Sequence, residues 1–216
     1  TPGEAKQDWK LIVELAKRCG LNWDYKNVSS VYEEMASTMS SLNNISWQRL
    51  EKEGAVCYPV DDETSFGNEI LFSEGFPTSN GKAKIVPADL MPPDEKPNKK
   101  YPFILTTGRL LEHWHTGAMT RRSSMLEAQE PVPTVSMHPH DIKKLGLKRG
   151  ENVLVETQRG IIEILLREDR DVSKGMLFIP FCFTESPANK LTNPHLDPYG
   201  KIPEFKYAAA RIYKAN

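Results

Sequence analysis

The clearest structural signal in the sequence is the stretch Asn152-Val-Leu-Val-Glu-Thr-Gln-Arg-Gly-Ile-Ile-Glu-Ile-Leu-Leu-Arg167. Two apolar runs rich in β-branched residues, 152–157 and 161–167, flank the turn residues Gln158-Arg159-Gly160. β-Branched side chains favour strands, and a short turn that contains glycine favours the antiparallel pairing of its flanks. The stretch therefore predicts a β-hairpin.

Similar short apolar runs lie on both sides of this hairpin. They predict further strands at 101–107, 134–138, 176–181 and 207–213. A short helix is expected at 139–145, because Pro139 suits a first helical turn and Gly146 suits a helix end. Several short strands with small helices between them favour a closed barrel over a doubly wound parallel sheet.

The first part of the chain has a different pattern of apolar residues. Apolar residues at helical spacing predict helices at 8–20, 28–41 and 46–53, and Asn80-Gly81 predicts a second hairpin. Prolines and charges in residues 91–100 predict a linker. We therefore expect an α+β, mainly β chain with a helical and hairpin segment at 1–95 and a β domain at 96–216.

The composition excludes several classes of partner. Lys+Arg (28) and Asp+Glu (29) nearly cancel, so no basic field is expected to hold nucleic acid or an anionic membrane surface. No apolar run approaches the roughly 18 residues that a membrane span needs, and the polar start lacks a signal peptide core. We expect no direct membrane insertion and a cytoplasmic protein, or a periplasmic one if it is exported with a partner.

The densest group of polar residues follows the strand expected at 101–107, so its side chains emerge together at one rim of the domain. The group contains Gly108, Arg109, Gly117, Arg121 and Arg122. Backbone N–H groups beside glycine can approach an anion closely, and an arginine can bind phosphate oxygens with two N–H groups. These features predict a pyrophosphate site, although a solvated loop is the alternative.

Three aromatic residues, His113, Trp114 and His115, belong to the same group and suit a flat heteroaromatic ligand. A zinc site is disfavoured because two histidines are an incomplete ligand set, and the three cysteines are too far apart to complete one. A serine hydrolase is disfavoured because no Gly-x-Ser-x-Gly motif is present. We therefore expect no protein-held metal.

Two further groups are candidates for the same ligand. His138-Pro-His-Asp141 ends an expected strand and opens an expected helix, and Asp141 could accept hydrogen bonds from a guanine-like edge or simply cap the helix. Asn189 has both donors and an acceptor, and Lys206 could balance ligand charge. Either could equally be an ordinary loop residue.

Together these motifs resemble the molybdopterin oxidoreductase superfamily, and within it the formate dehydrogenase catalytic subunits. The motifs that carry the resemblance are Leu105-Thr-Thr-Gly-Arg109, His113-Trp-His-Thr-Gly117, Met119-Thr-Arg-Arg-Ser123, His138-Pro-His-Asp141, Glu185-Ser-Pro-Ala-Asn-Lys-Leu-Thr-Asn193, Leu196-Asp-Pro198 and Pro203-Glu-Phe-Lys-Tyr207. The resemblance covers residue 101 to the end, and residues 76–84 resemble the segment that precedes this domain in the family.

The resemblance implies a double-psi β-barrel, preceded by a small helical segment, that binds a bis(molybdopterin guanine dinucleotide) cofactor with molybdenum or tungsten. Carried over by position, the implied contacts are Thr107, Gly108 and Arg109 with phosphate or pterin; His113, His115 and Thr116 with pterin; His138 and Asp141 with guanine; and Asn189, Lys206 and Tyr207 closing over the pterin.

The implied function is that of the C-terminal portion of a formate dehydrogenase, which oxidises formate to CO2 by two electrons. In this family the metal ligand from the protein and the iron–sulfur cluster lie in an earlier part of the subunit. That part and an electron-transfer subunit are the expected partners, and the chain alone is expected to be inactive. A non-catalytic pterin-dinucleotide binding module and a nitrate reductase are the alternatives; residues 113–117 favour formate.

Overall fold

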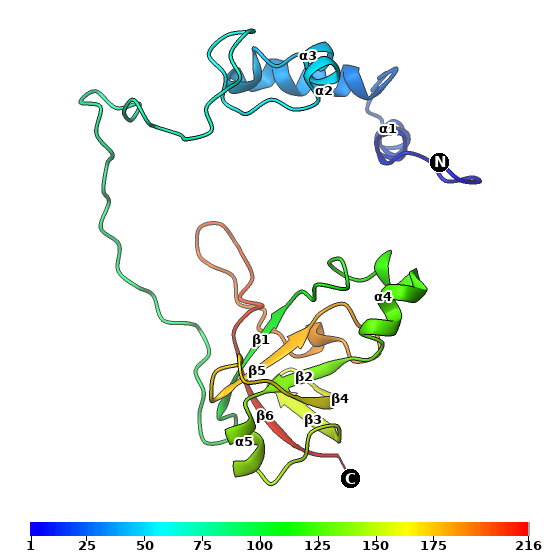
Figure 1. Cartoon of the computed structure of the whole chain (residues 1–216), viewed down its shortest axis with the longest axis vertical. Helices are drawn as coiled ribbons and strands as arrows, with labels where there is room; N and C mark the ends of the chain where they lie inside the picture. The colour runs from blue at the N-terminus through cyan, green and yellow to red at the C-terminus, as the bar shows by residue number, and fades with distance from the viewer. Residues whose placement is uncertain (216) are drawn as a thin grey trace. The chain divides into compact units, whose positions relative to one another are not determined.

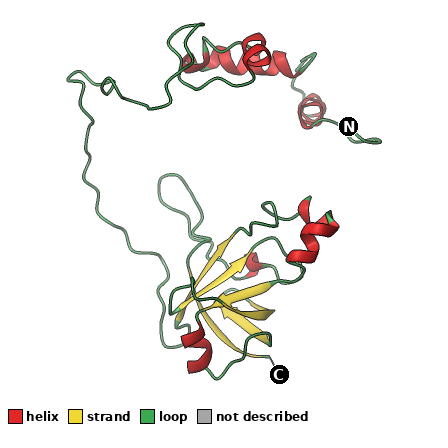
Figure 2. Cartoon of the chain, viewed as in Figure 1, coloured by secondary structure: helices red, strands yellow, loops and turns green. Residues whose placement is uncertain are grey.

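The computed structural model describes residues 1–215, and its internal contacts divide the chain into two compact units, Thr1–Pro87 and Ala88–Asn216. All described strands belong to the second unit (Figure 2). The predicted start of the β domain at residue 96 stays a prediction. No helix in residues 1–215 is long and apolar enough to cross a membrane.

The first unit contains the three predicted helices. They are α1 (Asp8–Arg18), α2 (Val28–Thr38) and α3 (Trp47–Glu53), with a 3-10 turn η1 (Ser40–Leu42) after α2. The predicted ends at residues 20 and 41 were too late. Ser46 caps α3, because its side chain accepts a hydrogen bond from the Arg49 N–H at 3.1 Å.

The hairpin predicted at Asn80-Gly81 was wrong in part. The turn exists, since the Gly81 N–H donates to the Thr78 carbonyl at 3.1 Å, but no strand forms between α3 and residue 103. A lone two-stranded ribbon is marginal in water, and here Ile85 is 90% exposed with no apolar surface of its own unit to cover it. The local turn signal was therefore correct, but the strands lacked a partner.

The second unit is a closed six-stranded barrel with the order β1-β5-β2-β4-β3-β6 (Figure 1). Its strands are β1 (Phe103–Gly108), β2 (Thr134–Met137), β3 (Asn152–Thr157), β4 (Ile161–Glu168), β5 (Met176–Pro180) and β6 (Ala208–Lys214). β1–β5 and β2–β4 pair in parallel, and the other neighbours are antiparallel. This is the expected double-psi β-barrel, and the β3–β4 hairpin is confirmed.

Short helices connect the strands. They are η2 (Thr120–Arg122), α4 (Ser124–Gln129), α5 (Pro139–Lys144) and η3 (Ala188–Lys190). Strand ends differ from prediction by a residue or two for local reasons. β1 begins at Phe103 because Pro102 has no N–H to give to a ladder, and β2 ends at Met137 because His138 becomes the N-cap of α5.

Buried and exposed side chains alternate along the strands, and the buried ones form the barrel core. On β4, Ile162, Ile164 and Leu166 are buried, whereas Ile161 before them and Glu163 between the first two are exposed. They pack with buried residues from the other strands, among them Leu177 and Ile179 of β5, and so form one apolar cluster.

Strand directions define the two ends of the barrel. From the pairing, β1, β3 and β5 end at one side and β2, β4 and β6 end at the other. We call these ends the Gly108 rim and the Met137 rim. Figure 1 shows α4 beside the first and α5 beside the second.

Replacing Ile179 by alanine should destabilise the barrel strongly. Its side chain is fully buried, so the variant loses apolar burial and leaves a cavity, at a cost of about 2–5 kcal/mol. Ile161→Ala is the matched control: this side chain is 45% exposed, so less than about 1 kcal/mol is expected. Urea unfolding measures both, and equal losses would contradict the packing described.

Candidate cofactor-binding site

All but two of the predicted site residues lie at the Gly108 rim. They end or follow β1, precede β6, or lie in η3 against the turn between β3 and β4. These residues are Thr107, Gly108, Arg109, His113, His115, Thr116, Asn189, Lys206 and Tyr207. His138 and Asp141 lie at the opposite end, the Met137 rim. The barrel thus brings together three segments that are distant in sequence.

The end of β1 is fixed against the other segments of the rim. The Thr107 hydroxyl donates to the carbonyl of Phe205 at 3.0 Å, and so holds the segment that carries Lys206 and Tyr207. The Phe181 N–H donates to the Gly108 carbonyl at 3.1 Å. A side chain at Gly108 would meet the ring of Phe178 at 2.5 Å, so only glycine fits there without a shift.

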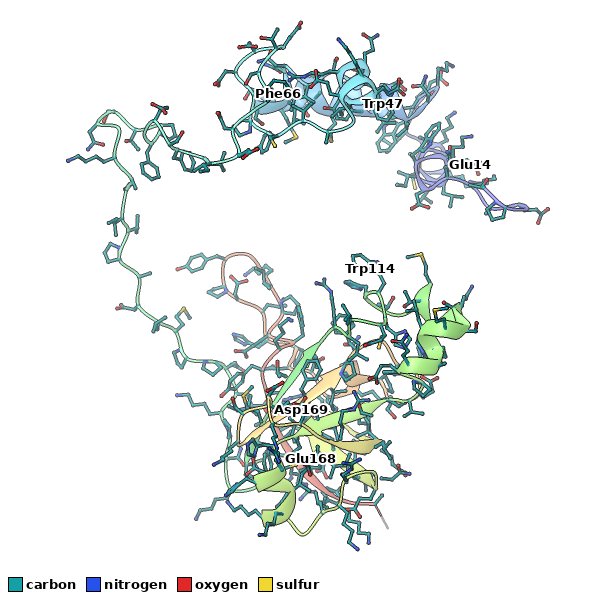
Figure 3. All side chains as sticks on the ribbon, in the orientation of Figure 1. Glu14, Trp47, Phe66, Trp114, Glu168 and Asp169 are labelled. Atoms are coloured by element: carbon teal, nitrogen blue, oxygen red, sulfur yellow. The ribbon has the colours of Figure 1, made fainter. Side chains whose placement is uncertain are left out.

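The loop after β1 folds back on itself and presents aromatic side chains outward. The Gly117 N–H donates to the Trp114 carbonyl at 2.9 Å, and Gly117 has φ +74°, which glycine adopts without strain. His115 also lies in the left-handed region, and its ring meets Phe181 edge-on at 5.3 Å. His115 and Thr116 are exposed, and so is Trp114, which is labelled in Figure 3.

His113 supports this loop from below. Its side chain is fully buried, and its Nε2 lies 2.8 Å from the carbonyl oxygen of Glu130. A carbonyl only accepts, so Nε2 carries the proton. The other ring nitrogen, Nδ1, is buried without a partner, which is uncommon for a native polar atom. Its ring packs edge-on against Phe183 at 5.7 Å.

Arg121, one of three arginines predicted to bind phosphate, is already paired. Its guanidinium bonds Glu185 at 2.8 and 2.9 Å and Glu127 at 3.0 and 3.3 Å, and it stacks over Phe183 at 4.8 Å. These contacts join the loop after β1 to the loop after β5. Arg109 and Arg122 are exposed and, within residues 1–215, make no hydrogen bond or ion pair through their side chains.

At the Met137 rim the polar groups are used in folding. His138 caps α5, since its Nδ1 accepts from the His140 N–H at 3.0 Å, and the Gly175 N–H donates to Asp141 at 2.6 Å. Burial opposes ionisation of Asp141, but hydrogen bonds from Gly175 and His140 outweigh it and lower the pKa of the carboxyl. The guanine contact predicted for His138 and Asp141 stays a prediction.

Several features of the rim were not anticipated from the sequence. The packing of Phe181 against His115 and of Phe183 against His113 was not predicted, although a Phe-Cys-Phe run directly after a strand was a signal for it. Tyr207 also lines a cavity of about 1010 Å³ between residues 91–96 and residues 195–207. No group of three or more His, Cys, Asp or Glu side chains in the described part of the chain could hold a metal ion.

The Arg121–Glu185 pair should make the free energy of unfolding depend on pH in the acidic range. Hydrogen bonds from Arg121 lower the pKa of Glu185 from 4.5 to about 2, so its contribution is present above pH 4.5 and is lost as the pH falls toward 2. Glu185→Gln should therefore lower the melting temperature at pH 7, and most of that deficit should disappear only as the pH approaches 2. Thermal unfolding across this range tests it, and a deficit that does not change with pH would refute the pairing.

Comparison with known proteins gives the same picture. Residues 103–209 match the family described as the molydopterin dinucleotide binding domain. The chain is 39% identical over 213 residues to the F420-dependent formate dehydrogenase subunit alpha of Methanocaldococcus jannaschii, covering 98% of this chain and 32% of that protein. It is 31% identical to the assimilatory nitrate reductase catalytic subunit of Bacillus subtilis, covering 98% and 31%.

Among solved structures, the acetylene hydratase of Pelobacter acetylenicus matches with a TM-score of 0.66 at 24% identity, over 99% of this chain and 33% of that one. The chain therefore spans about a third of the length of the proteins it matches. Three findings agree: the closed barrel, the matched family and the similarity along nearly the whole chain. The chain therefore belongs to the molybdopterin oxidoreductase superfamily and corresponds to the C-terminal part of such an enzyme.

Proposed function

We propose that this chain is the C-terminal, cofactor-binding portion of a molybdenum- or tungsten-dependent formate dehydrogenase. The observation that carries the proposal is 39% identity to a formate dehydrogenase alpha subunit over 98% of the chain. The identity to a nitrate reductase over the same share is lower, at 31%. The cofactor in this proposal is bis(molybdopterin guanine dinucleotide).

The charges of the Gly108 rim fit such a ligand. Arg109, Arg122 and Lys206 are exposed there, and their side chains make no ion pair with any residue of 1–215, whereas Arg121 is neutralised by two carboxylates. Cations left unpaired at one end of a barrel suit an anion, and a pyrophosphate offers one. The exposed rings of Trp114 and His115 suit the flat pterin that the pyrophosphate carries.

The residues divide the work of binding. Arg109 offers two parallel N–H donors to pyrophosphate oxygens, and Gly108 lets the backbone come close. Asn189, Lys206 and Tyr207 contact the pterin, while His113 supports the loop that presents His115 and Thr116. When bound, the cofactor supplies the metal centre that takes two electrons from formate. The chain's own residues bind and orient that cofactor.

If this chain binds the cofactor, the other functions of the enzyme belong to its remaining parts. The metal ligand from the protein and the iron–sulfur cluster would belong to the rest of the catalytic subunit, and a separate electron-transfer subunit would accept the electrons. A cytoplasmic location is proposed, with the periplasm as the alternative. A non-catalytic module that stores or inserts the pterin dinucleotide would use the same rim.

The native enzyme that contains this chain should oxidise formate. Purified with its partners, it is expected to reduce a viologen dye with formate and to leave nitrate unreduced by the reduced dye. Nitrate reduction without formate oxidation would favour the nitrate reductase alternative. If the chain is found alone and neither substrate is turned over although the pterin is retained, the non-catalytic module is supported.

Arg109→Ala should weaken the binding of guanosine diphosphate by the isolated chain. The variant loses a two-pronged contact to phosphate, so the dissociation constant should rise by about tenfold or more. Arg18→Ala is the control, because this exposed arginine lies in α1 and belongs to the first unit. Isothermal titration calorimetry measures both, and an unchanged affinity of Arg109→Ala would remove the site assignment.

A further inference from the structure

An ion pair outside the predicted site joins the segments that build the Gly108 rim. Glu95 is 8% exposed and pairs with Arg159, which lies in the turn between β3 and β4. We propose that Glu95 and Arg159 are positioning residues that set the shape of the rim for the pterin end of the ligand. The inference rests on the proposed function, since it concerns the same site.

Arg159 holds the segment that carries Asn189. One arm of its guanidinium meets Glu95, and the other donates to the carbonyl of Leu191 at 3.1 Å. Leu191 is fully buried, so its backbone cannot move without disturbing the core. The fit is tight, because a side chain at Gly160 would lie 2.9 Å from the Lys190 carbonyl. Asn189 is therefore held over the β3–β4 turn.

Glu95 holds the segment that carries Lys206 and Tyr207. The carboxylate oxygen that does not meet Arg159 accepts a hydrogen bond from the Ala209 N–H at 2.9 Å. Pairing between β3 and β6 ends at Thr157 and Ala210, so this bond continues that edge of β6 beyond its last contact with β3, while Ala209 pairs with Ile104 of β1 on the other edge. Tyr207 stands two residues before Ala209. One ion pair thus fixes both arms that the proposal closes over the pterin.

The energetics of the Glu95–Arg159 pair indicate that it positions the segments of the rim more than it stabilises the fold. Buried ion pairs often contribute little net stability, because desolvation offsets their attraction, and apolar replacement of both partners is frequently neutral. Here the Nε of Arg159 is also buried without a partner, which adds a further cost. What the pair supplies is a fixed spacing between three segments, and a preformed site binds more tightly than one that must be ordered.

The test removes both charges together. The variant Glu95→Met with Arg159→Met leaves no unpaired charge, so urea unfolding should show a folded chain with only a modest loss of stability, which comes from the Ala209 N–H and the Leu191 carbonyl left without these partners. It loses the bonds to Leu191 and Ala209, so its affinity for biopterin, a fluorescent pterin, should fall about tenfold. Glu95→Gln is the milder variant: it keeps an acceptor for Ala209, and a fall of about threefold is expected.

A second ion pair on the same barrel is the control. Glu156 of β3 pairs with Arg211 of β6 at 2.6 Å but bonds none of the segments that carry the rim residues. Glu156→Met with Arg211→Met should leave biopterin affinity unchanged. Full affinity in the folded Glu95 and Arg159 variants would overturn the inference, as would equal losses in the control.

The wild-type chain separates this inference from the proposed function. If it binds neither guanosine diphosphate nor biopterin, the proposed cofactor site fails and the inference fails with it. If it binds guanosine diphosphate, and Arg109→Ala abolishes that binding, the proposed site stands. Absence of biopterin binding in that same wild-type chain, or no effect of the Glu95 and Arg159 variants on it, overturns the positioning role alone.

Discussion

The parallel pairing of β1 with β5 is the constraint on which the rest of the site depends. Because the two strands run the same way, Gly108 lies beside Pro180 and both chains leave the barrel at one end. Two long loops must then share that end, and Arg121 joins them by binding Glu185 of one and Glu127 of the other. An antiparallel pair would have sent the loops to opposite ends and divided the ligand site.

The strands could be predicted from the sequence because their signal is local. Runs such as 152–157 and 161–167 are apolar and β-branched, and burial in a barrel rewards that composition whichever strands become neighbours. The failed hairpin at Asn80-Gly81 shows the limit of local reasoning. The turn formed, but a strand needs a partner, and nothing in residues near it supplied one.

The site was only partly predictable, for the same reason. Thr107, Gly108 and Arg109 could be placed at a strand end, since strand ends are readable from apolar runs. Which end of the barrel His138 and Asp141 occupy depends on strand direction, and direction follows from pairing between distant segments. The pairing of Glu95 with Arg159 was equally hidden, because a glutamate in a proline-rich stretch looks like any solvated linker residue.

The residues of the barrel suit ligand binding, and this indicates which functions belong to this chain and which to the rest of the enzyme. Its core is apolar, its buried charges are paired or hydrogen-bonded, and the unpaired Arg109 and Arg122 lie at the same rim as the exposed rings of Trp114 and His115, which is an arrangement suited to an anion that carries a flat ring. Proteins named as a formate dehydrogenase, a nitrate reductase and an acetylene hydratase resemble it over nearly its whole length. A scaffold common to such different named activities does not by itself select a reaction, so that choice is expected in the two thirds of the relatives that lie outside the match.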